Sequence, residues 1–134
     1  MNSYRFIPII VIFLFIHLNI LLAFSSTEVS TLGLFHIIET TEKERLHLLI
    51  VNTIKSHTHN LFFQYGPVNA APFSVYITED DIQFESLTTQ NIPSWATGFA
   101  KGDEIVIQSP QQKSMSYETF NRVLMHEISH IYLN

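Results

Sequence analysis

The sequence His126-Glu127-Ile128-Ser129-His130, an H-E-x-x-H motif, constrains the fold of this chain more than any other feature. Residues four apart on a helix project from the same face, so a helix here would bring both histidines to one metal ion. Glu127 would lie about 100° round the helix from His126, where it can reach a water molecule on that metal. Zinc hydrolase sites need two neutral imidazoles, a third ligand and an open position for water. The motif therefore predicts a helix that carries a zinc site.

The residues around the motif favour an amphipathic helix that begins near Tyr117. Apolar side chains gather on the side away from His126, at positions Phe120, Leu124, Ile128 and Ile131. Ser116 is a suitable N-cap, and the helix dipole favours Glu118 in the first turn. An ordinary amphipathic helix with solvated polar residues is the alternative. The two histidines and the glutamate opposite an apolar stripe favour the metal site.

The first 25 residues have the composition of a leader. Phe6–Phe24 is almost entirely apolar, Arg5 precedes it, and Ala23-Phe24-Ser25 resembles a small-residue cleavage site. We therefore expect residues 1–25 to be a signal peptide or, because residues 6–24 are nearly long enough to cross a bilayer, an N-terminal transmembrane anchor. Both interpretations place the rest of the chain outside the cytoplasm: secreted, periplasmic or anchored to the membrane. His17 lies inside this leader and is not expected to bind metal.

Composition excludes several classes of function and site. A net charge of -5 and the absence of a basic run argue against a nucleic-acid partner. The chain has no cysteine, which excludes disulfides and thiolate zinc ligands. An exported domain without disulfides fits a bacterial export route. With 134 residues, the chain has room for one small domain after its leader.

Hydrophobic periodicity predicts an α+β domain with one mixed sheet. We expect a polar linker over residues 26–32 and helices over residues 41–65 and 117–133, the first with a capping box of Thr41 and Glu44. The expected strands cover residues 34–38, 73–78 and 104–108, and residues 97–107 are expected to form a hairpin that turns at Gly102. The order strand, helix, strand, hairpin, helix is typical of α+β domains.

Other residues with metal-binding chemistry have simpler explanations. His57 falls within the apolar face of the helix expected over residues 41–65, where a hydrogen-bonded core histidine is more common than a ligand. His36 on a strand and His59 on a polar helix face are expected to be packed or solvated. The acidic run Glu79-Asp80-Asp81 is expected to end a strand and to cap a short helical turn that carries Ile82 and Phe84.

Three segments together resemble a known family. Residues 93–100 (Pro-Ser-Trp-Ala-Thr-Gly-Phe-Ala), then Ile105-Val106-Ile107, then residues 120–130 around the motif look like the bacterial peptidase MA-like metallohydrolases, a group of gluzincins. The resemblance runs from about residue 33 to the C-terminus and implies a zincin-like peptidase domain over residues 33–134. In that family a tryptophan-glycine segment precedes an edge strand above the zinc.

Carried over by position, His126 and His130 match the zinc ligands and Glu127 matches the catalytic glutamate. The family's third ligand, a glutamate on a later helix, has no counterpart, because the sequence ends four residues after the motif. The resemblance thus implies the N-terminal subdomain of a zincin, incomplete at its C-terminus, and we expect the chain to be a fragment.

The leading hypothesis is a zinc metallopeptidase that cleaves peptide or protein substrates, with Zn²⁺ as cofactor and Glu127 as general base. In it, the strand expected over residues 104–108 forms the cleft edge and pairs with an extended substrate. The alternative is a catalytically inactive zincin-like binding module, inert without a third ligand. An intramembrane metalloprotease is excluded, because Leu124–Leu133 is too short and too polar to cross a bilayer.

Overall fold

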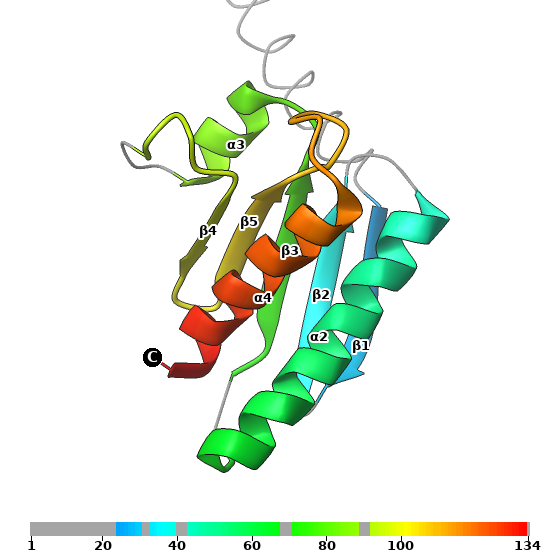
Figure 1. Cartoon of the computed structure of the whole chain (residues 1–134), viewed down its shortest axis with the longest axis vertical. Coiled ribbons are helices and arrows are strands. Elements are labelled where there is room, and N and C mark those ends of the chain that lie inside the picture. The colour runs from blue at the N-terminus through cyan, green and yellow to red at the C-terminus, as the bar shows by residue number, and fades with distance from the viewer. Residues whose placement is uncertain (1–23, 31–32, 40–42, 68–70, 89–91, 134) are drawn as a thin grey trace, which may run out of the picture.

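The computed structural model of the chain describes residues 24–30, 33–39, 43–67, 71–88 and 92–133. These residues form the following elements, labelled as in Figure 1: β1 (Phe24–Ser30), β2 (Gly33–Glu39), α2 (Glu44–Tyr65), β3 (Phe73–Thr78), α3 (Asp81–Thr88), β4 (Gly98–Lys101), β5 (Glu104–Gln108) and α4 (Tyr117–Leu133). The α+β class expected from the sequence is confirmed.

The strands form one mixed sheet in the order β1-β2-β3-β5-β4. The three inner strands β2, β3 and β5 run parallel, whereas β1 and β4 are antiparallel to their neighbours. Since α4 follows β5 and returns along the sheet, it runs in the same direction as the edge strand β4 (Figure 1). At the candidate site, described below, α4 and β4 therefore run in the same direction.

Helices α2 and α4 lie side by side on one face of the sheet (Figure 1). Alternation along β3 sends Phe73, Val75 and Ile77 toward this helical layer, and all three are buried. They pack there with apolar side chains from both helices and from β2 and β5: Phe35, Ile37, Leu46, Ile50, Ile54, Ile105, Ile107, Phe120, Leu124 and Ile128. Burial of this shared core fixes α4 on the sheet. The shorter α3 packs on β3 and β5.

Most of the predicted elements are confirmed. The strands expected over residues 34–38, 73–78 and 104–108 correspond to β2, β3 and β5, and the expected hairpin corresponds to β4 and β5. Gly102 lies in the hairpin turn with a φ angle of 60°, a backbone conformation that favours glycine. The helix expected over residues 117–133 is α4, and the amphipathic helix expected from residue 41 is α2.

Two expectations at the ends of elements are wrong. The polar linker expected over residues 26–32 is largely a strand: β1 pairs along its whole length with β2, from Phe24 opposite Glu39 to Ser30 opposite Gly33. The capping box is also wrong, because α2 begins only at Glu44, after Lys43 as N-cap without a side-chain cap hydrogen bond. Thr41, the other half of that box, lies outside the described residues.

The leader prediction for residues 1–25 falls almost wholly outside the part of the chain that the structure describes, which starts at Phe24. Within the described ranges, none of the helices combines the length and the apolar character that a bilayer span requires.

Candidate metal centre

Local sequence determines where α4 begins and which of its faces is buried. The Ser116 hydroxyl accepts a hydrogen bond from the backbone N–H of Thr119 at 3.1 Å, so the predicted N-cap is confirmed. Phe120, Leu124 and Ile128, which lie on one side of the helix, are completely buried in the core. The opposite side is therefore turned away from the sheet, and it carries His126 and His130.

The two motif histidines converge in space. Their Nε2 atoms lie 3.1 Å apart, and the rings meet edge to face with centroids 4.7 Å apart. Both side chains are exposed. Two nitrogens bound to one tetrahedral zinc ion would lie about 3.3 Å apart, given zinc–nitrogen bonds of about 2.0–2.1 Å. The observed spacing is close to that value, and it also suits a hydrogen bond from one neutral ring to the other.

Glu127 lies beside the histidines but is buried between α4 and β4, with 7% of its surface exposed. Its carboxylate accepts a hydrogen bond from the backbone N–H of Ala100 in β4. Burial raises the pKa of Glu127, and the neighbouring histidines and the Ala100 amide offset part of that rise. The motif thus combines two exposed imidazoles with one desolvated carboxylate.

β4 approaches α4 closely because residue 98 has no side chain. A Cβ atom at Gly98 would lie 2.7 Å from Val123 Cγ1, which is closer than ordinary packing allows, and 3.0 Å from Glu127 Oε1, which is unusually tight. The glycine of the sequence segment Trp-Ala-Thr-Gly therefore has a packing role at the site. It lets the edge of the sheet lie directly against the glutamate.

A groove of about 680 Å³ runs between α4 and the segment that leads into β4. It is lined by Ile92, Pro93, Trp95, Ala96, Thr97, Gly98, Phe99, Ala100, Thr119, Arg122, Val123, His126, Glu127 and His130. The three motif residues predicted from the sequence thus share one groove. Trp95 is 80% exposed, so its ring is a free apolar surface at this site.

β4, and not β5, forms the edge of the sheet at this groove. The expectation that residues 104–108 form the cleft edge is wrong, because β5 lies between β3 and β4. The sequence did contain a signal: Ile105-Val106-Ile107 is continuously apolar, as is typical of a strand covered on both faces. β4 is short and contains glycine, alanine and lysine, which is more typical of an edge.

α4 is also held by polar contacts to α2 that the sequence did not predict. The Thr53 hydroxyl donates to the side-chain carbonyl of Asn121, and the Tyr132 hydroxyl donates to the backbone carbonyl of Gly66. Between them, His57 Nε2 lies 3.0 Å from the hydroxyl of Ser129, inside the motif. These contacts tie the motif helix to α2 along its length.

His57 is a packing residue, as expected. The Ser129 hydroxyl donates to the carbonyl of Met125 at 2.9 Å, and its oxygen can accept a hydrogen bond from His57 Nε2, 3.0 Å away. Burial lowers the pKa of His57, and its hydrogen bond to the Met125 carbonyl offsets part of that effect. His57 therefore supports the helix from the side that faces away from the groove.

The other candidate ligands do not join the site. His36, His59 and the acidic run Glu79-Asp80-Asp81 line no part of the groove. The Asp80 carboxylate accepts a hydrogen bond from the backbone N–H of Gln83 at 2.7 Å, which confirms the predicted helix cap. Within the described ranges, no group of three or more histidine or acidic residues is arranged to hold a metal ion. In the described part of the chain, the structure therefore brings together the two predicted ligands without a third.

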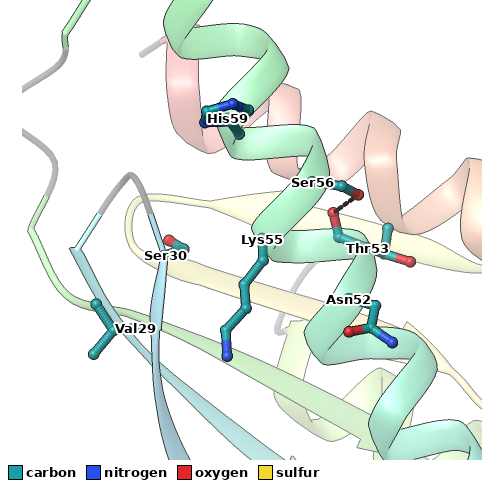
Figure 2. Close-up of a pocket in the computed structure, with 7 residues that line it drawn as sticks. All are labelled: Val29, Ser30, Asn52, Thr53, Lys55, Ser56 and His59. Carbon is teal, nitrogen blue, oxygen red and sulfur yellow. Dashed lines mark hydrogen bonds between the residues drawn. The ribbon is translucent and has the colours of Figure 1, made fainter.

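A second hollow, of about 690 Å³, lies between β1 and α2 (Figure 2). It is lined by Val29, Ser30, Asn52, Thr53, Lys55, Ser56 and His59, none of which lines the groove at the motif. Lys55 Nζ is already paired with a Glu28 carboxylate oxygen at 2.9 Å. Its lining residues, as far as the structure describes them, form no cluster of three or more histidine or acidic side chains that could hold a metal ion.

Comparisons with protein-family models, with curated proteins and with solved structures find no match to this chain.

Proposed function

We propose that this chain carries the catalytic groove of a zinc-dependent metallopeptidase, built on a zincin-like subdomain. One observation supports this most: two exposed imidazole nitrogens 3.1 Å apart adjoin a buried carboxylate in a groove beneath an edge strand. An ordinary amphipathic helix with a solvated polar face would not need a buried carboxylate beside two converging histidines. The residues in the groove that carry the function are His126, His130 and Glu127.

The residues present fit two of the positions that a zinc site needs. His126 and His130 would hold the ion through their Nε2 atoms. The separation of these atoms is close to that of two nitrogen ligands on one tetrahedral zinc ion. When bound, zinc acidifies a water molecule and polarises a carbonyl group. The described residues offer no third protein ligand, so the remaining positions would fall to water or to a group from elsewhere.

Glu127 is suited to the role of general base. Its burial raises its pKa toward the range in which a carboxylate accepts and returns protons near neutral pH. It would take a proton from the attacking water and then deliver it to the nitrogen of the leaving amine. The Ala100 amide holds the carboxylate in the groove during both transfers.

The edge strand β4 is suited to binding an extended peptide. Gln108 N–H donates to the Thr97 carbonyl at 2.9 Å, so the backbone groups of Thr97, Phe99 and Lys101 point toward β5. The N–H and C=O of Gly98 and the C=O of Ala100 point away from β5, beside the motif, whereas the Ala100 N–H is bonded to Glu127. A peptide that pairs with these groups would lie along the groove, which favours peptide or protein substrates.

The alternative is a catalytically inactive module that binds peptides through the same groove. The observation that favours it is the absence of a third ligand among the residues that the structure describes. In both cases we place the domain outside the cytoplasm, since its sequence begins with a leader-like segment.

The deciding experiment is a zinc titration of the full chain beside His126→Ala and His130→Ala. We expect weak one-to-one binding in the parent, because two histidines are one ligand short, and we expect its loss in both variants. His59→Ala, an exposed histidine outside the groove, is the matched control. Zinc binding that both motif variants retain would exclude the site. Hydrolysis of a mixed peptide library that depends on zinc supports the peptidase, and zinc binding without hydrolysis supports the inactive module.

A further inference from the structure

Among the described residues that line the groove, Arg122 alone carries a permanent positive charge. It lies four residues before His126, on the same face of α4, and its side chain is exposed. Within the described part of the chain, no carboxylate lies within ion-pair distance of its guanidinium. Its hydrogen-bond partner there is the hydroxyl of Thr119, at 3.5 Å, which also lines the groove.

We propose that Arg122 binds the free C-terminal carboxylate of a peptide lying in the groove. A guanidinium is the side chain best matched to a carboxylate, because its N–H groups can donate in parallel to both oxygens. The rest of the groove wall near it is apolar or uncharged, including Trp95, Pro93 and Val123. Of the lining residues that the structure describes, a carboxylate that entered there would meet one permanent cation, Arg122, and one acid, the buried Glu127.

The direction of the strands determines which end of the peptide meets Arg122. α4 and β4 run in the same direction (Figure 1). A peptide that pairs antiparallel with β4 therefore runs opposite to α4, with its C-terminal part pointing toward the N-terminal half of that helix. Arg122 lies in that half. This step rests on the proposed function, since it assumes that the peptide pairs with the edge strand.

The spacing along α4 sets the length of the C-terminal part. Arg122 and His126 are four residues apart, which is about 6 Å along a helix axis. An extended peptide advances about 3.3 Å per residue, so the carboxylate would lie one or two residues beyond the bond held at the histidines. Hydrolysis of that bond adds one water, leaving a new carboxyl group on the N-terminal piece and a free amine on the released amino acid or dipeptide. The inferred substrate class is thus peptides cleaved near a free C-terminus.

The test measures peptide binding by the full chain without metal, so that its result does not depend on zinc or on hydrolysis. Three ligands are compared: N-acetyl-trialanine with a free carboxylate, the same peptide as its C-terminal amide, and N-acetyl-Ala-Asp-Ala amide. We expect the free acid to bind roughly fivefold more tightly than the amide, as for a partly exposed ion pair, and the difference to shrink at high salt. Arg122→Gln should remove the difference, and Arg122→Lys should keep part of it.

Lys101→Gln is the matched control, because Lys101 is an exposed cation of β4 that does not line the groove. It should leave the preference for the free acid unchanged. Equal binding of acid and amide, or no binding of either, would overturn the inference even if zinc binding and hydrolysis were found. Binding of the aspartyl amide as tight as that of the free acid would assign Arg122 to acidic side chains and overturn the C-terminal assignment. A preference for the acid in a chain that hydrolyses nothing would leave the inference standing while the proposed reaction failed.

Discussion

Glu127 combines an ionisable group with a buried position, and this has a consequence for stability. Burial raises the pKa of its carboxyl group in the folded chain above the value in the unfolded chain. The unfolded chain then releases its proton at lower pH than the folded chain. The free energy of unfolding therefore falls as the pH rises from the unfolded pKa through the folded pKa. At neutral pH the charged glutamate destabilises the fold.

We predict that Glu127→Gln stabilises the full chain at pH 7.5 and removes any peptidase activity. Glutamine keeps the shape of the side chain and can still accept from the Ala100 amide, but it has no charge to desolvate and cannot act as a base. The expected gain is on the order of 1 kcal/mol, or a few degrees in melting temperature. The gain should shrink below about pH 4, where glutamate is protonated in both states.

Thermal denaturation at pH 7.5 and at pH 4 measures this effect. Glu118→Gln is a suitable control, because Glu118 is an exposed glutamate in the first turn of the same helix. There the helix dipole favours the charge, so glutamine should give no gain. A lower melting temperature for Glu127→Gln than for the parent at pH 7.5 would contradict the assigned direction of the pKa shift.

The convergence of His126 and His130 could be predicted from the sequence, because helix periodicity alone brings residues i and i+4 together. It also places Glu127 at the boundary between the exposed face and the buried stripe. The role of Gly98 could not be predicted, since it depends on how closely another element approaches. Arg122 lies on the same face of the helix as the histidines, but only the structure shows that it lines the same groove.

At the scale of elements, the contact between β4 and α4 depends on Gly98. We predict that Gly98→Ala destabilises the full chain by about 1–3 kcal/mol, because its Cβ atom would overlap Val123 Cγ1 and crowd the Glu127 carboxylate. Denaturant unfolding measures the change. The double variant Gly98→Ala with Val123→Ala removes the Cγ1 atom and should recover part of the loss beyond simple additivity. Full stability of the single variant would show that β4 does not lie this close to α4.

The existence of α2 and α4 could be predicted, but the way in which they lock together could not. Both have one apolar face, which is visible in the sequence as a period of 3.6 residues. The contacts that tie them, such as His57 to Ser129, join side chains 72 residues apart in the sequence. Periodicity holds no information on such pairs. It could indicate only that His57 belongs to the packed face.

For the whole molecule, the sequence predicts the class of sheet better than the order of its strands. The inner strands could be predicted because they are rich in β-branched and aromatic residues. β1 has the polar sequence Phe-Ser-Ser-Thr-Glu-Val-Ser and forms a strand because it pairs with β2, which is a tertiary effect. A tertiary effect also explains why β4, and not β5, is the edge strand. The hairpin was predicted, but which of its two strands pairs with β3 depends on burial.

This order leads to a prediction for hydrogen exchange across the full chain. β2, β3 and β5 have strand neighbours on both sides and lie beneath α2 and α4, so their amides should exchange slowest, near the rate set by global unfolding. Among the described strands, β1 and β4 have one neighbour each and should exchange faster through local opening. β1 should nevertheless be protected, because its ladder to β2 runs over all seven of its residues.

Exchange of the amides of β1 at the rate of an unstructured peptide, measured by mass spectrometry, would mean that a polar linker describes it better than a strand. Exchange in β4 as slow as in β3 would place β4 inside the sheet and leave no free edge for a peptide to pair with.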